Sequence, residues 1–138
     1  MKIFLDANIC LDLLDTTRPT SKQSIQWYMT NKDNLDIEFY FSADFITTFY
    51  YILTEKKKYN PKVILSAIDA LSDEIIPSYL IHNDFINAKN QFLENIFSDF
   101  EDLLVLNIAQ RVKCDKLITN DKKLLQLKKY QNIRIQKP

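Results

Sequence analysis

The sequence contains no glycine among its 138 residues. Glycine is the residue that most readily adopts positive φ at helix ends and tight turns, so we expect asparagine, aspartate or lysine to occupy these positions. The absence also excludes two kinds of active site, because P-loops and the nucleophile elbow of serine hydrolases are both built on glycine. The chain must therefore carry out any chemistry without either device.

Length and charge predict one domain of neutral overall charge, spanning residues 1–138. Basic and acidic side chains number 18 each, so no global field attracts the chain to nucleic acid. Residues 116–138 are nevertheless basic, with seven Lys and Arg against the single acid Asp121, a local excess of six positive charges. Any attraction to phosphate groups must therefore be local.

Cys10 and Cys114 each lie alone in an apolar stretch, without the paired spacing of a zinc site or a disulfide framework. They are typical of reduced thiols in a cytosolic protein. The first apolar run is only three residues long and leads directly into Asp6, which predicts neither a signal peptide nor a membrane span. We expect a cytoplasmic protein with no membrane partner.

Apolar β-like runs alternate with helical patterns along the chain. We expect strands at residues 3–5, 38–41, 75–77, 116–119 and 133–135, and helices at residues 9–14, 20–29, 42–57, 62–71, 83–96 and 98–113 and just after Asp121. Ser42 and Asn60 are predicted N-caps, the latter followed by Pro61 at the first helical position. This alternation predicts an α/β domain with a mainly parallel sheet of about five strands.

Two of the expected strands end in an aspartate. Asp6 follows the strand at residues 3–5, and Asp121 follows Thr119 and Asn120 after a later strand. Ligands of open α/β sheets bind outside the carboxyl ends of parallel strands, so both acids are candidate site residues. Helix capping is the structural alternative for each, although Asn8 is the better-placed cap at the first helix.

A third acidic segment contains Asp99, Glu101 and Asp102. Ser98 and Glu101 have the spacing of a capping box, which gives Glu101 a structural role. Asp99 lies in the first helical turn, where the helix dipole alone favours an acid. Asp102 shares a helix face with Asp99, so the two carboxylates are placed to face one metal ion. The lone His82 lies near a helix start and is expected at the surface.

The motifs Leu5-Asp6-Ala7-Asn8, Asp99-Phe100-Glu101-Asp102 and Ile118-Thr119-Asn120-Asp121, in this order, resemble the PIN-domain ribonucleases, particularly the VapC-like toxins of toxin–antitoxin pairs. The resemblance spans nearly the whole chain. It implies a three-layer α/β/α fold and an acidic cluster that binds Mg²⁺ or Mn²⁺ and hydrolyses RNA. It also implies an antitoxin partner and a homodimer, and the aromatic residues at 39–41 and 49–51 are candidates either for a dimer contact or for the core.

Carried over by position, Asp6, Asp102 and Asp121 are the expected catalytic residues. The expected metal ligands are these three and Asp99, and the expected supporting residues are Asn8, Thr119, Asn120 and Thr48. The family usually has a glutamate where Thr48 stands, and Asp44 lies one turn earlier as a possible substitute. Lys122 and Lys123 are expected to neutralise RNA phosphates, although solvated lysines on a helix would look the same.

Two other function classes fit parts of this pattern. Phosphoryl transfer through an aspartyl intermediate also uses acids at strand ends, but it needs a second acid where Asn8 stands. A catalytically weakened binding module would keep the fold without turnover, and Thr48 favours that class. The expected reaction is metal-assisted hydrolysis, because Mg²⁺ binds one or two carboxylates together with substrate phosphate.

Overall fold

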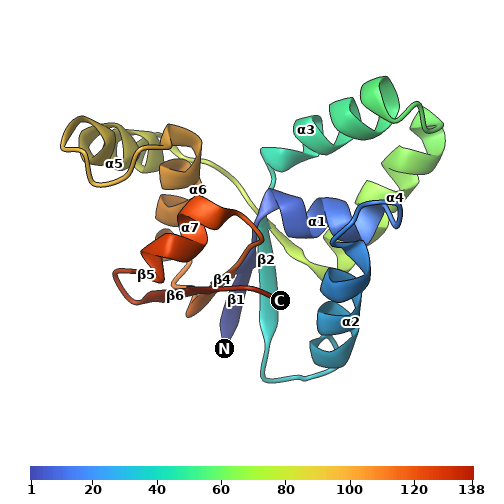
Figure 1. The fold of residues 1–138 in the computed structure, drawn as a ribbon, viewed down its shortest axis with the longest axis horizontal. Helices are drawn as coiled ribbons and strands as arrows, with labels where there is room; N and C mark the ends of the chain where they lie inside the picture. Colours follow the sequence, from blue (N-terminus) through green and yellow to red (C-terminus); the bar gives the residue numbers. More distant parts are fainter.

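The computed structural model describes all residues 1–138 and contains one six-stranded sheet, in the order β3-β2-β1-β4-β6-β5 (Figure 1). The strands are β1 (Lys2–Leu5), β2 (Glu38–Ser42), β3 (Ile76–Ser78), β4 (Lys116–Ile118), β5 (Lys129–Tyr130) and β6 (Ile133–Gln136). The helices are α1 (Ala7–Leu14), α2 (Ser21–Asn31), α3 (Phe45–Tyr51), α4 (Pro61–Glu74), α5 (His82–Leu93), α6 (Phe100–Arg111) and α7 (Lys122–Leu127). The five expected strands are all present. The added strand is the two-residue β5, which pairs antiparallel with β6 while all other pairs are parallel.

Strand alternation divides the apolar side chains between two cores. Ile3 and Leu5 of β1 belong to the core that the first four helices cover, whereas Phe4 packs under α5, α6 and α7. Successive strand residues point to opposite faces of a sheet, which is why a wholly apolar strand needs helices on both sides. The fold is the predicted three-layer α/β/α arrangement.

The order in which strands join the sheet changes side at β1. Strands β2 and β3 lie on one side of β1, and the chain then crosses to β4 on the other side. The Asp6 amide donates to the Ile118 carbonyl at 3.0 Å, so the carboxyl ends of β1 and β4 lie side by side. This is the topological switch point at which open α/β sheets bind their ligands.

Helix termini confirm the expectation drawn from the missing glycine. Five residues have positive φ, and four of them are Lys or Asn at or just after a helix end: Lys58, Asn95, Lys113 and Lys128. The fifth is Gln131, in the turn between β5 and β6, which was not among the expected residue types. Asn60 caps α4 by accepting bonds from the Lys62 and Val63 amides.

Some helix boundaries differ from the predictions. Ser42 ends β2 instead of capping a helix, and α3 starts at Phe45 and continues as a π-helical segment, η1 (Ile52–Lys56). The reason is that Ser42 still pairs with Ser78 of β3 and the Ala43 amide donates to the Ser78 carbonyl, so the strand extends past the predicted start of the helix. Asp6, rather than Asn8, is the N-cap of α1, because its side chain accepts from the Ala7 amide.

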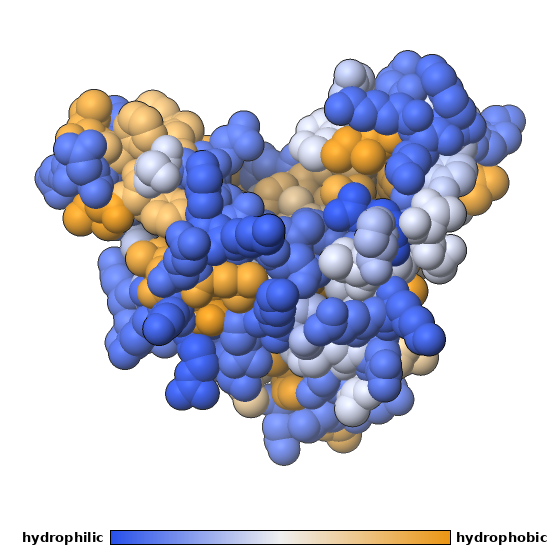
Figure 2. All heavy atoms as spheres, in the orientation of Figure 1, coloured by the Kyte–Doolittle hydropathy of each residue, from blue (hydrophilic) through white to orange (hydrophobic).

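Two arms rise beyond the carboxyl edge of the sheet, one formed by α3 and α4 and the other by α5 and α6 (Figure 1). The molecular surface is hollowed between them, and hydrophobic residues lie at the floor of this hollow (Figure 2). The switch point opens toward the same edge. No helix combines the length and the apolar character that crossing a membrane requires.

Candidate active site

Asp6 is a buried acid at the switch point, with a relative exposure of 6%. One carboxylate oxygen accepts from the Ala7 amide at 2.8 Å. The other accepts from the Thr119 hydroxyl at 2.6 Å and the Asn8 side-chain amide at 2.8 Å. These donors satisfy a carboxylate that would otherwise be costly to bury. The side chain of Asp6 is thus held in one orientation.

The same network extends to the segment after β4. Asn8 Oδ1 accepts from the Asn120 backbone amide at 2.9 Å, and Thr119 Oγ1 accepts from the Asp121 amide at 2.9 Å. Asp121 is the N-cap of α7 and accepts from the Leu124 amide. The structure therefore brings Asp6, Asn8 and residues 119–121 together, and Asp121 keeps one carboxylate oxygen without a protein partner.

Asp99 and Asp102 approach this group from α6. Asp99 is the N-cap of α6, and its side chain accepts from the Asp102 amide at 3.0 Å. The predicted capping box is therefore wrong: the cap is Asp99 rather than Ser98, and the exposed Glu101 side chain makes no hydrogen bond. Asp102 lies past the capping position, and its carboxylate is free of hydrogen bonds from the protein.

Burial and neighbouring negative charges raise the pKa of two aspartates of this group. Burial raises the pKa of Asp102 to about 7, and the negative charges of Asp6, Asp99 and Asp121 contribute to this rise. Burial also raises the pKa of Asp6, with a further contribution from Asp121, although the bonds from Thr119, Ala7 and Asn8 oppose it. Mutually repelling carboxylates at a ligand-binding edge are typical of a functional site.

Comparison with known proteins agrees with this geometry. The family model described as the PIN domain matches residues 2–123. The chain belongs to the PIN-domain family. It is 32% identical over 128 residues to Ribonuclease VapC1 of Aquifex aeolicus (strain VF5), an alignment that covers 88% of this chain and 82% of that protein.

Solved VapC structures share the fold of this PIN-domain chain. VapC20 of Mycobacterium tuberculosis, described as a toxin that cleaves the sarcin–ricin loop, superposes with a TM-score of 0.72 at 11% identity and covers 96% of this chain and 98% of its own. VapBC2 of Rickettsia felis, bound to a promoter DNA fragment, gives 0.68 at 14% identity, covering 100% and 99%. The chain is a VapC-like PIN-domain protein.

The donor set suits a hard divalent ion. The four aspartates offer oxygen ligands only, which Mg²⁺ and Mn²⁺ prefer, and no thiolate or imidazole lies among them. No group of three or more aspartate, glutamate, histidine or cysteine side chains lies close enough together to hold a metal ion. Mg²⁺ can bind with fewer protein ligands, because it keeps several waters and binds one or two carboxylates directly. Asp102 and Asp121 have the free oxygens for that role.

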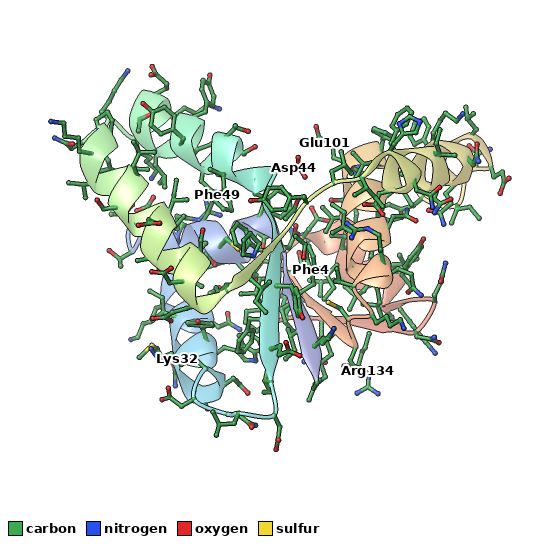
Figure 3. The ribbon with its side chains drawn as sticks, turned by 180° about the vertical axis from the view of Figure 1, so that it is seen from behind. Phe4, Lys32, Asp44, Phe49, Glu101 and Arg134 are labelled. Carbon is green, nitrogen blue, oxygen red and sulfur yellow. The ribbon has the colours of Figure 1, made fainter.

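Thr48, the residue expected at the position of the family's usual glutamate, is exposed on α3 and donates no side-chain hydrogen bond. It lines a cavity of about 210 Å³ between α3 and α6, together with Ser42, Asp44, Phe45, Leu80, Glu101, Leu104, Val105 and Ile108. Asp44 and Glu101 both lie at the opening between the two arms (Figure 3). A larger cavity of about 370 Å³ lies among α1, α2 and α4, away from the aspartates.

Two features of the site were not predicted. The first is the Asp44–Glu101 cavity, which joins segments far apart in the sequence. The second is Asp12, a fully buried acid of α1 that accepts from Arg18, Thr20 and Ser24 and lies 3.4 Å from the Asn120 side-chain nitrogen. The sequence signal that could have revealed Asp12 is the presence of an acid within the apolar run of α1.

Lys122 and Lys123 are exposed at the start of α7, next to Asp121.

Proposed function

We propose that this protein is a divalent-metal-dependent endoribonuclease and the toxin of a toxin–antitoxin pair. The observation that supports the proposal is that Asp6 and Asp121 belong to one hydrogen-bond network at the switch point, and that their negative charges, with that of Asp99, help burial to raise the pKa of Asp102 to about 7. Ribonuclease VapC1, a relative at 32% identity, supports the reaction class. The active form is proposed to be cytoplasmic, in keeping with two buried, unpaired cysteines.

We propose Mg²⁺ or Mn²⁺ as the cofactor, held by Asp6, Asp99, Asp102 and Asp121 directly or through water. The ion supplies charge neutralisation at the scissile phosphate and makes a bound water more acidic. Asp6, Asp102 and Asp121 are the proposed catalytic residues. The Asp102 carboxylate accepts no hydrogen bond from the protein, so it is free to bind the ion or to orient the attacking water.

The supporting residues act by positioning. Thr119 and Asn8 both donate to the same oxygen of Asp6, which leaves that carboxylate no freedom to rotate. Asn120 closes the network through its backbone amide. Lys122 and Lys123 are proposed to bind phosphates of the RNA beside Asp121, so binding should weaken as salt rises.

Thr48 is proposed to lower the activity, because a hydroxyl replaces the negative charge that PIN domains usually place there. The substitution Thr48→Glu should raise the rate of RNA cleavage several-fold at saturating Mn²⁺. Thr48→Ser, which restores no charge, is the matched control. A rate that is unchanged in Thr48→Glu would show that position 48 does not limit the reaction.

The direct test is cleavage of a labelled RNA panel by the purified chain with Mg²⁺ or Mn²⁺. We expect cleavage to disappear with EDTA and to fall at least a hundredfold in Asp6→Asn and Asp121→Asn. Asp69→Asn, at an exposed position of α4, is the control and should retain full activity. Cleavage that persists after chelation would contradict the metal-dependent mechanism.

We propose a small antitoxin protein as a partner. Structural neighbours of this chain include VapBC-1 of Haemophilus influenzae and a toxin–antitoxin complex of Klebsiella pneumoniae, which support such a partner. Co-purification of the tagged chain with the product of the adjacent gene is the test. Inhibition of RNA cleavage by that product is the expected result.

We also propose a homodimer. The aromatic residues that suggested a dimer contact are mostly in the core, since Phe39, Phe41 and Phe49 are buried and only Tyr50 and Tyr51 are exposed. The support lies instead on the arm of α5, where the exposed large apolar side chains are Phe85, Phe92, Leu93 and Ile96 (Figure 2). Light scattering should give twice the chain mass, and Leu93→Lys should reduce it to the monomer.

The second candidate is a binding module of the same fold without turnover, which the threonine at position 48 favours. An RNA panel left intact at high Mn²⁺, together with tight binding of the antitoxin, would support it. Membership of the PIN family leaves aspartyl-phosphate chemistry without support. Absence of covalent labelling of Asp6 by a phosphodonor would agree with that.

A further inference from the structure

The cavity between α3 and α6 lies beside the helix that carries Asp102. Its floor is apolar, formed by Phe45, Leu80, Leu104, Val105 and Ile108, and its polar rim carries Asp44, Thr48 and Glu101. Val105, which lines the cavity, lies three residues after Asp102 and so on the same face of α6, which places the cavity beside the proposed reaction centre. Its volume of about 210 Å³ is below the roughly 300 Å³ at which pockets begin to hold drug-sized ligands.

The two rim carboxylates have no cationic partner, because no ion pair in the structure involves Asp44 or Glu101. The Ser42 hydroxyl and the Leu80 amide, each at 3.1 Å, both donate to Asp44 Oδ2. They fix the direction of this carboxylate and leave Oδ1 free. The cavity therefore offers a planar ligand several hydrogen-bond acceptors, with the Thr48 hydroxyl as the one side-chain donor not already engaged.

The carboxylates and the apolar floor favour the base of an RNA nucleotide over its phosphate. Its phosphate is repelled by Asp44 and Glu101, whereas its base has flat apolar faces that suit the floor. Among the four bases, guanine alone presents two adjacent N–H donors, N1–H and the 2-amino group, which can donate to two carboxylate oxygens, whether these belong to one carboxylate or to two. Adenine, cytosine and uracil each place an acceptor beside their donor, and carboxylates repel it.

We propose that the cavity between α3 and α6 binds a guanine base of single-stranded RNA, with Asp44 and Glu101 accepting from its N1–H and 2-amino groups. This inference rests on the proposed ribonuclease function and names a sequence preference for it. A base held there leaves its neighbouring phosphate close to Asp102. Cleavage is then expected next to guanosine.

The experiment measures binding apart from cleavage. Fluorescence anisotropy in EDTA compares the full chain with four labelled hexamers that are identical except at one central base: guanine, hypoxanthine, adenine or uracil in an otherwise all-uridine strand. Hypoxanthine lacks only the 2-amino group of guanine. We expect the guanine hexamer to bind at least tenfold more tightly than each of the other three.

Variants of the cavity residues test whether the preference for guanine arises from the cavity. Glu101→Gln and Asp44→Asn should each reduce the preference for guanine below threefold, while binding of the all-uridine hexamer stays equal or becomes tighter because a negative charge is lost. Leu80→Trp, at a 38%-exposed position of the lining, should block the cavity without disturbing the core. Glu94→Gln, an exposed acid outside the cavity, is the matched control and should keep the preference.

Equal affinity for all four hexamers, or a preference that survives in both Glu101→Gln and Asp44→Asn, would overturn the proposal. Failure of the cavity proposal can be distinguished from failure of the ribonuclease proposal. RNA cleavage without a guanine preference would remove the cavity proposal alone, whereas a guanine preference without cleavage in Mn²⁺ would remove the ribonuclease proposal and leave the binding site.

Discussion

Asp102 is expected to destabilise the metal-free protein at neutral and alkaline pH. Its pKa is about 7 in the folded chain against 3.8 for an unperturbed aspartate, a difference of roughly 3 units, or about 4 kcal/mol at 1.36 kcal/mol per unit. Because the side chain is only partly buried, solvent screening reduces this to roughly 1–2 kcal/mol.

The sign follows from proton linkage. Between about pH 4 and pH 7 the folded chain binds more protons at Asp102 than the unfolded chain does, so this group's contribution to stability falls as pH rises. Below that window Asp102 is neutral in both states and the penalty vanishes. Above it the penalty is complete. Asp102→Asn should therefore stabilise the protein at pH 8 and have little effect at pH 4.

Thermal unfolding followed by circular dichroism in EDTA tests this. A gain of about 1 kcal/mol corresponds to roughly 3 °C in a domain of this size, so the melting temperature of Asp102→Asn should exceed that of the wild type by about 3 °C or more at pH 8. Asp69→Asn is the control and should shift the melting temperature by less than about 1 °C. A gain that is the same at pH 4 and pH 8, or a loss at pH 8, would refute the reasoning.

Three further predictions concern the core and the buried polar groups. Asp12→Ala should lower the free energy of unfolding by about 3–5 kcal/mol in urea denaturation, because Arg18, Thr20 and Ser24 lose a buried partner; the exposed Asp69→Ala should change it by less than about 0.5 kcal/mol. Phe49→Ala should cost about 3–5 kcal/mol in the same assay, since its ring is fully buried, whereas Tyr51→Ala at an exposed position should cost far less. Cys10 and Cys114 should resist Ellman's reagent until the chain is denatured, because both are buried and burial raises the pKa of each thiol; rapid reaction of either in the native protein would contradict this.

The strands and their order of appearance were predictable because local patterns encode them. The strand at residues 3–5 is apolar on both faces, which only a sheet covered on both sides can bury, and Asp6 follows it directly. Asp121 was recognisable by the same pattern, an apolar strand followed by an acid. The cap assignments were less predictable, because Ser98 and Asp99 are both suitable caps and tertiary placement of α6 selects between them.

The cavity residues could not be predicted, since Asp44 and Glu101 become neighbours only when α3 and α6 pack over the same edge of the sheet. Asp12 was missed for a related reason: its partners Arg18, Thr20 and Ser24 lie beyond the end of α1, and only the turn into α2 brings them back to it. Neither relation has a fixed sequence spacing, so no periodicity reveals it.

By itself the sequence determined the alternation of strands and helices, the acids at the strand ends and the use of Lys and Asn at most positive-φ positions, because each depends on residues close together in the chain. The tertiary structure decided how far the pKa of Asp102 rises, which oxygens of the aspartates remain free, and which side chains line the cavity beside them. These properties depend on burial and on charges from distant segments, and both exist only once the sheet has assembled.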